Sequence, residues 1–99
     1  AGGVRIDEPA VDLGIATSIT SSLRDKAVDP TAVAVGEIGL GGEIRTIGQI
    51  EKRVQEASKL GFKRIVVPQA NFKNVKVSGE IEVVGVERVE QAMEVLLTA

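Results

Sequence analysis

The sequence predicts a small α/β domain in which three helices pack on a mixed β-sheet. Short apolar runs rich in valine and isoleucine alternate with longer segments of helical periodicity, in the order β-α-β-β-α-β-β-α. The composition agrees, because 43% hydrophobic and 26% charged residues are typical of a globular protein. Ninety-nine residues suffice for one hydrophobic core, so we expect residues 1–99 to form a single domain.

The first half of the chain predicts a strand, a helix and two strands joined by a glycine-rich bend. An opening strand ends at Ile6, and Asp7-Glu8-Pro9 then favours a helix start, because proline is common at the first helical position. The helix is expected over 9–24, and its almost continuous apolar or small surface predicts that it is central and buried. Strands are expected over 32–35 and 43–47, on either side of four glycines.

The second half predicts two helices and two strands. A helix is expected over 50–60, because Ile50, Val54, Ala57 and Leu60 recur on one face, which should point inward, and Gly61 follows where a C-terminal cap is favoured. The remaining expected elements are a strand over 64–68, a polar loop over 69–78, a strand over 81–84 and a helix over 87–97.

The absence of two residue types restricts the chemistry of this chain. It contains no cysteine and no histidine, which excludes disulfides, the usual zinc sites, cysteine nucleophiles and catalytic groups built on imidazole. The glycines between 39 and 42 do not make a phosphate loop, because no Lys-Ser or Lys-Thr follows them and they lead into a strand. We therefore expect no cofactor in this domain.

The longest uncharged run, residues 13–23, is too short to span a bilayer, and no basic segment precedes it as in a signal peptide. We therefore expect no membrane partner. The chain opens with Ala1-Gly2-Gly3 and has no initiator methionine, so we expect it to be a piece of a longer protein.

The net charge of −2 is unevenly distributed along the chain. Residues 45–76 carry eight basic and two acidic side chains, whereas residues 1–44 carry three basic and seven acidic ones, and residues 77–99 one basic and five acidic ones. A basic middle between acidic ends favours an anionic partner. Solvated lysines and arginines on a helix and its loops are the commoner cause of such a pattern, and this alternative stays open.

Several sequence strings together carry a resemblance to a known family. They are Asp7-Glu8-Pro9-Ala10-Val11-Asp12, Gly36-Glu37-Ile38 followed by residues 42–51, and residues 59–68 followed by Asn71. Over essentially its whole length the chain resembles the proteolytic domain of Lon-type ATP-dependent proteases, and most of all the Lon-like C-terminal domains of bacterial DNA repair and recombination ATPases. The resemblance implies a Lon-type fold, also seen in a ribosomal protein S5 domain, with the N-terminal part of the domain missing.

The same resemblance implies the setting in which this domain works. The parent would be a cytoplasmic, hexameric, ring-forming protein with a role in DNA branch migration, acting with DNA and with a RecA-type recombinase. Its ATP and zinc would belong to upstream domains. This domain would contribute hexamer assembly and contact with the DNA backbone.

Lon-type proteases use a serine nucleophile that a lysine activates, and neither residue is kept at the matching positions of this chain. The serine position is Ala10 and the lysine position is Glu51. An alanine methyl group cannot attack a carbonyl, and a carboxylate would repel a developing oxyanion. Asp12 and Glu51 either form an acidic pocket for a divalent ion or, as we favour, each complements the dipole of its own helix.

The basic segment supplies the candidate DNA contacts. The predicted set is Arg45, Lys52, Arg53, Lys63, Arg64, Lys73 and Lys76. Phe62 and Phe72 are the only aromatic residues, so bases have no stacking platform and the contacts should go to phosphate, without sequence preference.

Two alternatives to this function remain open at this point. In one, the domain is a purely structural oligomerisation module, whose basic residues pair with the acidic ends of a neighbouring subunit. In the other, it is a degenerate or active Lon-type Ser-Lys peptidase domain. Self-association is expected in any case, because an uncovered sheet edge tends to pair with another chain.

Overall fold

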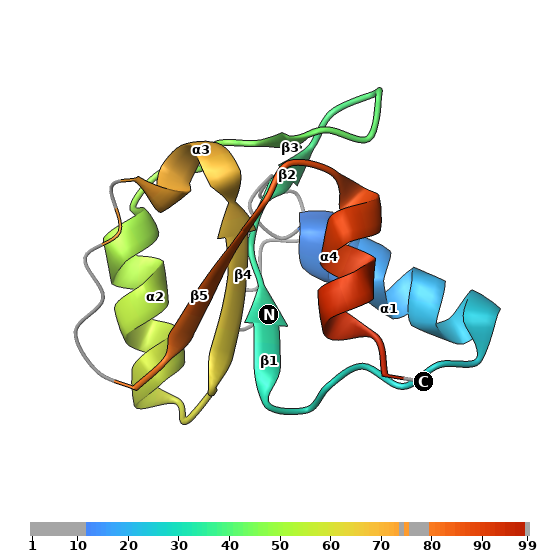
Figure 1. Ribbon diagram of the computed structural model, residues 1–99, viewed down its shortest axis with the longest axis horizontal. Helices are drawn as coiled ribbons and strands as arrows, with labels where there is room; N and C mark the ends of the chain where they lie inside the picture. The colour runs from blue at the N-terminus through green and yellow to red at the C-terminus, as the bar shows by residue number, and fades with distance from the viewer. Residues whose placement is uncertain (1–11, 74, 76–79, 99) are drawn as a thin grey trace, which may run out of the picture.

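The computed structural model describes residues 12–73, 75 and 80–98, and it confirms the predicted mixed α/β fold (Figure 1). In chain order the elements are α1 (Asp12–Arg24), β1 (Ala32–Ala34), β2 (Glu37–Ile38), β3 (Ile44–Arg45), α2 (Ile50–Lys59), β4 (Arg64–Pro68), α3 (Gln69–Phe72), β5 (Glu82–Val86) and α4 (Val89–Leu96). The opening strand predicted to end at Ile6 lies outside the described residues.

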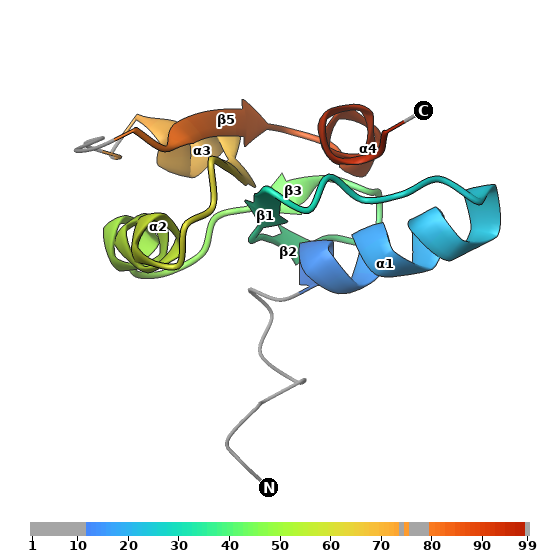
Figure 2. The same ribbon diagram turned by 90° about the horizontal axis from the view of Figure 1, so that it is seen from below.

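β4 is the central strand of a three-stranded parallel sheet with the order β1-β4-β5. Ile65, Val66 and Val67 of this strand are all buried. Because successive residues of a strand face opposite sides of the sheet, Val66 packs with residues of α1 and α4, whereas Ile65 and Val67 pack with residues of α2. The helices therefore cover the sheet from both faces (Figure 2).

Several features differ from the sequence-based expectation. Leu60, expected to face inward, is 77% exposed, because α2 ends at Lys59 and Leu60 follows as its C-cap. The segment expected to be a glycine-rich bend contains the short strand β2. β2 and β3 form a separate antiparallel hairpin and do not join the main sheet. The structure also contains a fourth helix, the short α3, in the segment predicted to be a loop. A single helical turn of four residues is too short to show helical periodicity in its sequence, which explains why it was missed.

The prediction that the first helix is central and buried was wrong. Only Leu13 and Thr17 of α1 are buried, whereas Ile15 and Ile19 are 43% and 56% exposed. The helix lies at the margin of the molecule, where it contacts α4, β1 and β2 along one side, and no described residue covers its opposite apolar side. Neither α1 nor any other described helix is long and apolar enough to cross a membrane.

Asn71 of α3 is a buried asparagine that holds the turn leading into α2. Its Oδ1 accepts a hydrogen bond from the Ile47 amide at 3.0 Å, and its Nδ2 donates one to the Ile47 carbonyl at 3.1 Å. The return strand expected over 43–47 therefore ends at Arg45, because the backbone of Ile47 pairs with a side chain instead of a strand. Gln49 then adopts a left-handed conformation, with φ of 57°, before α2 begins.

The β2–β3 hairpin is braced by Glu43 and Arg88. Glu43 Oε1 accepts a hydrogen bond from the Gly41 amide at 3.0 Å, and Arg88 Nη2 donates one to the Gly41 carbonyl at 2.6 Å. A hydrogen bond from its own backbone amide, followed by one from the Arg45 side chain, lowers the pKa of Glu43 below its ordinary value. A side chain on Gly39 would collide with the Glu43 carboxylate, so this position accepts only glycine without rearrangement.

We predict that Asn71→Ala destabilises the fold by about 2 kcal/mol, because it leaves the Ile47 amide and carbonyl without partners in a half-buried position. For a domain of this size the loss corresponds to a fall in Tm of roughly 10 °C in thermal unfolding. Asn71→Asp keeps the hydrogen-bond acceptor and loses the donor, so its Tm should lie between those of the parent protein and Asn71→Ala. Gln55→Ala, an exposed change in α2, is the control and should leave Tm nearly unchanged. Equal Tm values for Asn71→Ala and Gln55→Ala would contradict the role given to Asn71.

A second prediction concerns the stability of the hairpin at low pH. Because the folded pKa of Glu43 lies below its unfolded value of about 4.3, the ionised carboxylate stabilises the fold above that pH. This contribution is lost as the pH falls through the folded pKa. We expect Glu43→Gln to lower Tm at pH 7, and the difference from the parent protein to shrink as the pH falls below about 4 and through the folded pKa, when unfolding is followed by circular dichroism. A hydrogen bond from the Thr31 hydroxyl also lowers the pKa of Asp29. Because Asp29 is present in both proteins, its titration cancels in the difference between their Tm values. A constant Tm difference across this range would exclude a charge effect.

Candidate nucleic-acid interface

The first turn of α2 presents two of the predicted basic residues. Lys52 is exposed, and among the described residues it makes no hydrogen bond or ion pair. Arg53 is half-buried and donates from Nε to the Gly48 carbonyl at 3.0 Å, so this arginine helps to close the turn before the helix. Lys52 is therefore the more available of the two for an external anion.

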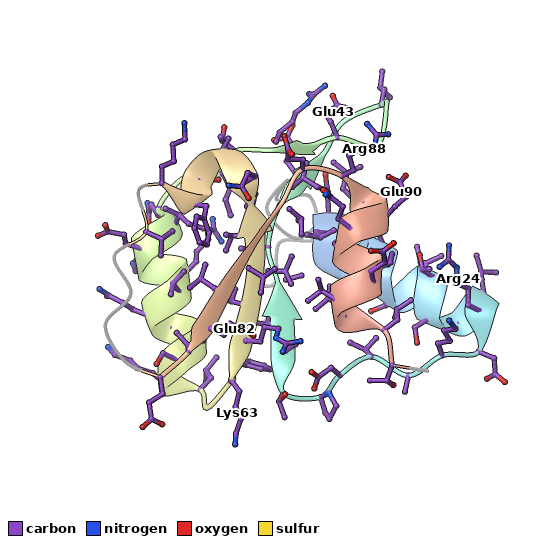
Figure 3. The ribbon with its side chains drawn as sticks, viewed as in Figure 1. Arg24, Glu43, Lys63, Glu82, Arg88 and Glu90 are labelled. Carbon is purple, nitrogen blue, oxygen red and sulfur yellow. The ribbon has the colours of Figure 1, made fainter. Side chains whose placement is uncertain are left out.

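Lys63 and Lys73 are both exposed and lie at opposite ends of β4. Lys63 directly precedes the strand, and Figure 3 shows its side chain pointing away from the sheet. Lys73 follows α3, which itself follows β4 directly, so the whole of this five-residue strand lies between the two lysines in the chain. The hydrogen bonds between Asn71 and Ile47 bring Lys73 to the same end of the molecule as the start of α2. Lys76 lies outside the described residues.

Arg45 is engaged by two carboxylates of its own hairpin. Its Nη2 lies 3.2 Å from Glu43 Oε2, and its Nη1 lies 3.7 Å from Glu37 Oε1. Glu37 is the register partner of Arg45 across the hairpin, and Glu43 lies two residues before it on the same face of the strand. A phosphate group would have to compete with both carboxylates for this guanidinium.

Arg64 is also paired within the domain. Its Nε lies 2.6 Å from Oε1 of Glu82, its register partner on the neighbouring strand β5. Cross-strand pairs of opposite charge stabilise a sheet by a fraction of a kcal/mol. The two predicted arginines that lie in strands thus have structural partners, which sequence reasoning missed. The two-residue spacing of Glu43 and Arg45 was a signal for one of these pairs, whereas Glu82 lies eighteen residues from Arg64 and gave none.

The basic residues therefore form no compact pocket. Of the predicted set, Lys52, Lys63 and Lys73 are exposed and without a carboxylate partner among the described residues, as is Lys59 of α2, whereas Arg45 and Arg64 are ion-paired. Such a spread of isolated ammonium groups suits a long polyanion, which touches each charge with a different phosphate. It does not suit a small anion, which needs several donors at one point.

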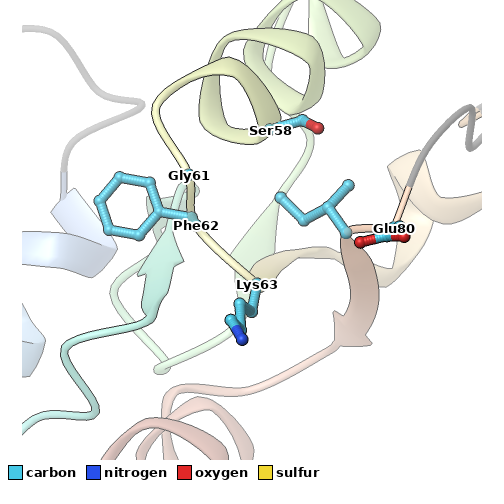
Figure 4. Close-up of a pocket in the computed structure, with 6 residues that line it drawn as sticks. Ser58, Gly61, Phe62, Lys63 and Glu80 are labelled. Atoms are coloured by element: carbon cyan, nitrogen blue, oxygen red, sulfur yellow. The ribbon is translucent and has the colours of Figure 1, made fainter.

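A hollow of about 400 Å³ lies beside Lys63, between the end of α2 and the starts of β4 and β5 (Figure 4). Ser58, Phe62, Lys63 and Glu80 are among the residues that line it. In Figure 4 the ammonium group of Lys63 points away from the hydroxyl of Ser58, and no hydrogen bond joins the two residues. The hollow therefore shows no nucleophile and base in contact.

Of the two positions expected to match the catalytic pair of the Lon family, the structure describes only one. Glu51 is exposed in the first turn of α2, and Ala10 lies outside the described residues. Asp12 has a structural role, because its Oδ2 accepts a hydrogen bond from the Ile38 amide at 3.2 Å and so ties the start of α1 to β2. Among the described residues no three acidic side chains are grouped closely enough to hold a metal ion.

Comparison with known proteins places these observations in a family. The whole chain, residues 1–99, matches the family described as Lon protease (S16) C-terminal proteolytic domain. A DNA repair protein RadA from Halalkalibacterium halodurans is 54% identical over 97 residues, which is 98% of this chain and 21% of that protein. Proteins of the same name from Listeria monocytogenes and Bacillus subtilis are 54% identical over 94 residues and 50% identical over 97.

The match with the Listeria monocytogenes protein covers 95% of this chain, and the match with the Bacillus subtilis protein covers 98% of it. Each match covers 21% of the relative. The chain therefore spans about a fifth of the length of these relatives and corresponds to their C-terminal part. The family model and the relatives agree with each other and with the mixed α/β fold. The chain belongs to the Lon protease (S16) C-terminal proteolytic domain family, in the form that occurs in DNA repair proteins named RadA.

Proposed function

We propose that this chain is a non-catalytic Lon-like domain that contacts the DNA backbone and contributes to hexamer assembly in a DNA repair and recombination ATPase. The observation that carries the proposal is that Lys52, Lys63 and Lys73 are exposed and have no carboxylate partner among the described residues. The similarity to DNA repair proteins, one of them 54% identical over 97 residues, supports DNA as the anion that these lysines contact. Binding through lysine and phosphate is independent of base sequence, which suits a protein that must act anywhere on a chromosome.

The parent protein supplies the chemistry in this proposal. ATP and zinc bind to domains upstream of this one, and no cofactor binds here. The parent acts in the cytoplasm, as DNA repair in bacteria requires, and works beside a RecA-type recombinase in branch migration. The four fifths of each relative that this chain does not match leave ample length for those domains.

Loss of peptidase activity is the second part of the proposal. Ala10 and Glu51 stand at the positions of the catalytic serine and lysine, so the chain lacks both the nucleophile and its activating base. Glu51 is exposed. A catalytic pair shifted along the chain would use Ser18 of α1, whose hydroxyl donates to the Gly14 carbonyl at 3.2 Å, and Lys52. A shifted pair of Ser18 with Lys52 has no support from a contact between them.

A purely structural oligomerisation module is the second candidate function. The apolar side of α1 favours it, because Ile15, Ile19 and Leu23 are exposed on a helix without a charge between Asp12 and Arg24. Charge depletion is typical of the core of a protein–protein interface. Assembly and DNA contact can occur in the same domain, because they use different residues. The exposed apolar residues lie on α1, whereas Lys52 lies in α2, Lys63 directly before β4 and Lys73 directly after α3.

The DNA contact predicts a specific effect of charge reversal. Lys52→Glu combined with Lys73→Glu should weaken binding to duplex DNA alike for all sequences. The slope of log K against log salt should also fall by about one unit for each lysine–phosphate pair that the substitutions remove. Fluorescence anisotropy at several salt concentrations measures both quantities.

The matched control is Arg24→Glu combined with Lys26→Glu. These residues are also exposed, and the change in net charge is the same, but they lie at the end of α1 outside the basic segment. If both double variants lose affinity equally, the protein responds only to net charge and the proposed interface is wrong. If neither loses affinity, the domain does not contact DNA through this segment.

The proposal also predicts that the chain hydrolyses neither casein nor fluorogenic peptides above the rate in buffer. The physical reason is the replacement of the nucleophile by Ala10 and of the base by Glu51. Activity that survives repurification and disappears when a single serine is replaced by alanine would establish a different catalytic site and overturn this part of the proposal.

A further inference from the structure

Lys59 is an exposed lysine at the last position of α2, and it is not a member of the predicted set of DNA contacts. Like that of Lys52, its side chain makes no hydrogen bond or ion pair among the described residues. The two lysines lie seven residues apart, close to two full turns of an α-helix, so they share one side of α2. This spacing corresponds to a rise of roughly 10 Å along the helix axis.

The side of α2 that carries these two lysines faces water. Ile50, Val54 and Ala57 are buried on the opposite side of the helix, where they pack with residues of β4. Figures 1 and 2 show α2 at the left margin of the molecule, with no described element over its outer side. The apolar spacing that buries one side of α2 therefore also sets the positions of Lys52 and Lys59 on the other.

One carboxylate lies between the two lysines on this side of α2. Glu56 follows Lys52 by four residues and precedes Lys59 by three, the two spacings at which helical side chains are neighbours. Glu56 is exposed, and in the described part of the chain its carboxylate forms no ion pair with either lysine. Glu51, the other acid of α2, lies about 100° around the helix from Lys52. A phosphate group that approaches both lysines is therefore repelled chiefly by Glu56.

We propose that the outer side of α2 lies along the DNA backbone, where Lys52 and Lys59 each bind a different phosphate group and Glu56 limits the affinity. The ammonium groups are complementary in charge to a polyanion. Phosphates of one strand follow each other at about 3.4 Å along the duplex axis, so two lysines roughly 10 Å apart along a helix reach separate phosphates. This inference rests on the DNA contact of the proposed function, adds Lys59 to it and gives it a direction along α2.

Lys59→Gln tests the added contact by fluorescence anisotropy with duplex DNA. Affinity should fall about threefold or more at roughly 0.1 M salt, and the slope of log K against log salt should fall by about one unit, because one phosphate contact is lost. Lys26→Gln is the matched control, because it removes the same charge from an exposed lysine beyond the end of α1 and should change neither quantity. Equal losses from the two substitutions would show a response to net charge alone and overturn the inference.

Glu56→Gln tests the limit on affinity and should strengthen binding. We expect a gain of about twofold, in line with the weak interactions of neighbouring exposed charges on a helix. Glu94→Gln removes an exposed carboxylate from α4 instead and should leave affinity unchanged. The same gain from both substitutions, or no gain from Glu56→Gln, would show that this carboxylate does not lie between two phosphate-bound lysines, and would contradict the inference.

Failure of this inference can be told apart from failure of the proposed function. If Lys52→Glu combined with Lys73→Glu weakens DNA binding and Lys59→Gln does not, DNA contact stands and the contact along α2 is wrong. If no substitution within residues 45–76 changes DNA binding, both are wrong.

Sedimentation and thermal unfolding complete the test. All four glutamine variants change exposed side chains, so their Tm values should stay close to that of the parent protein, which excludes unfolding as the cause of a changed affinity. If Lys59→Gln weakens self-association and leaves DNA binding unchanged, the outer side of α2 faces another copy of the chain, and the inference is wrong.

Discussion

Burial of β4 on both faces is the constraint on which the rest of this structure depends. A strand whose Ile65, Val66 and Val67 all exclude water must be covered from two sides, because its side chains alternate between the faces of the sheet. The chain meets this requirement with α2 on one face and with α1 and α4 on the other. Parallel pairing with β1 and β5 needs long connections, and the chain supplies them, because α2 lies between β1 and β4 and the short α3 with its loop lies between β4 and β5.

The close approach of α1 to the hairpin shows how tightly this arrangement is packed. Gly36 lies between Leu13 and Ile44, and a Cβ atom added to it would come within 2.9 Å of the Ile44 side chain. The Leu13 amide donates to the Gly36 carbonyl at 3.1 Å, and Asp12 adds its own hydrogen bond to the Ile38 amide. One end of α1 is thus held firmly to the β2–β3 hairpin. Leu13 and Thr17 add burial on one side of the helix, whereas Leu23 near its other end is exposed.

The sequence predicted the elements with strong periodicity and missed the features that depend on contacts between distant residues. The helix over 50–60 and the strand over 64–68 match α2 and β4 closely, because their apolar spacing is clear and Gly61 marks the boundary between them. The exposure of α1 was unpredictable, since an apolar pattern reports which residues avoid water and not whether a partner covers them. The role of Asn71 was also hidden, because its hydrogen bonds reach Ile47, twenty-four residues away.

The candidate interface illustrates the same limit at the level of charge. A count of basic residues along 45–76 treats Arg45 and Lys52 alike, but the fold gives Arg45 two carboxylate partners and leaves Lys52 in water. The difference follows from chemistry, because the planar guanidinium group pairs well with carboxylates across a strand, whereas the ammonium group of lysine keeps its hydration on a flexible stem. Arg45 and Arg64 therefore brace the hairpin and the sheet, whereas the side chains of Lys52, Lys63 and Lys73 stay in water. Under the proposed function each of these lysines would act alone on one phosphate, and affinity would grow with the number of domain copies that contact the same DNA molecule.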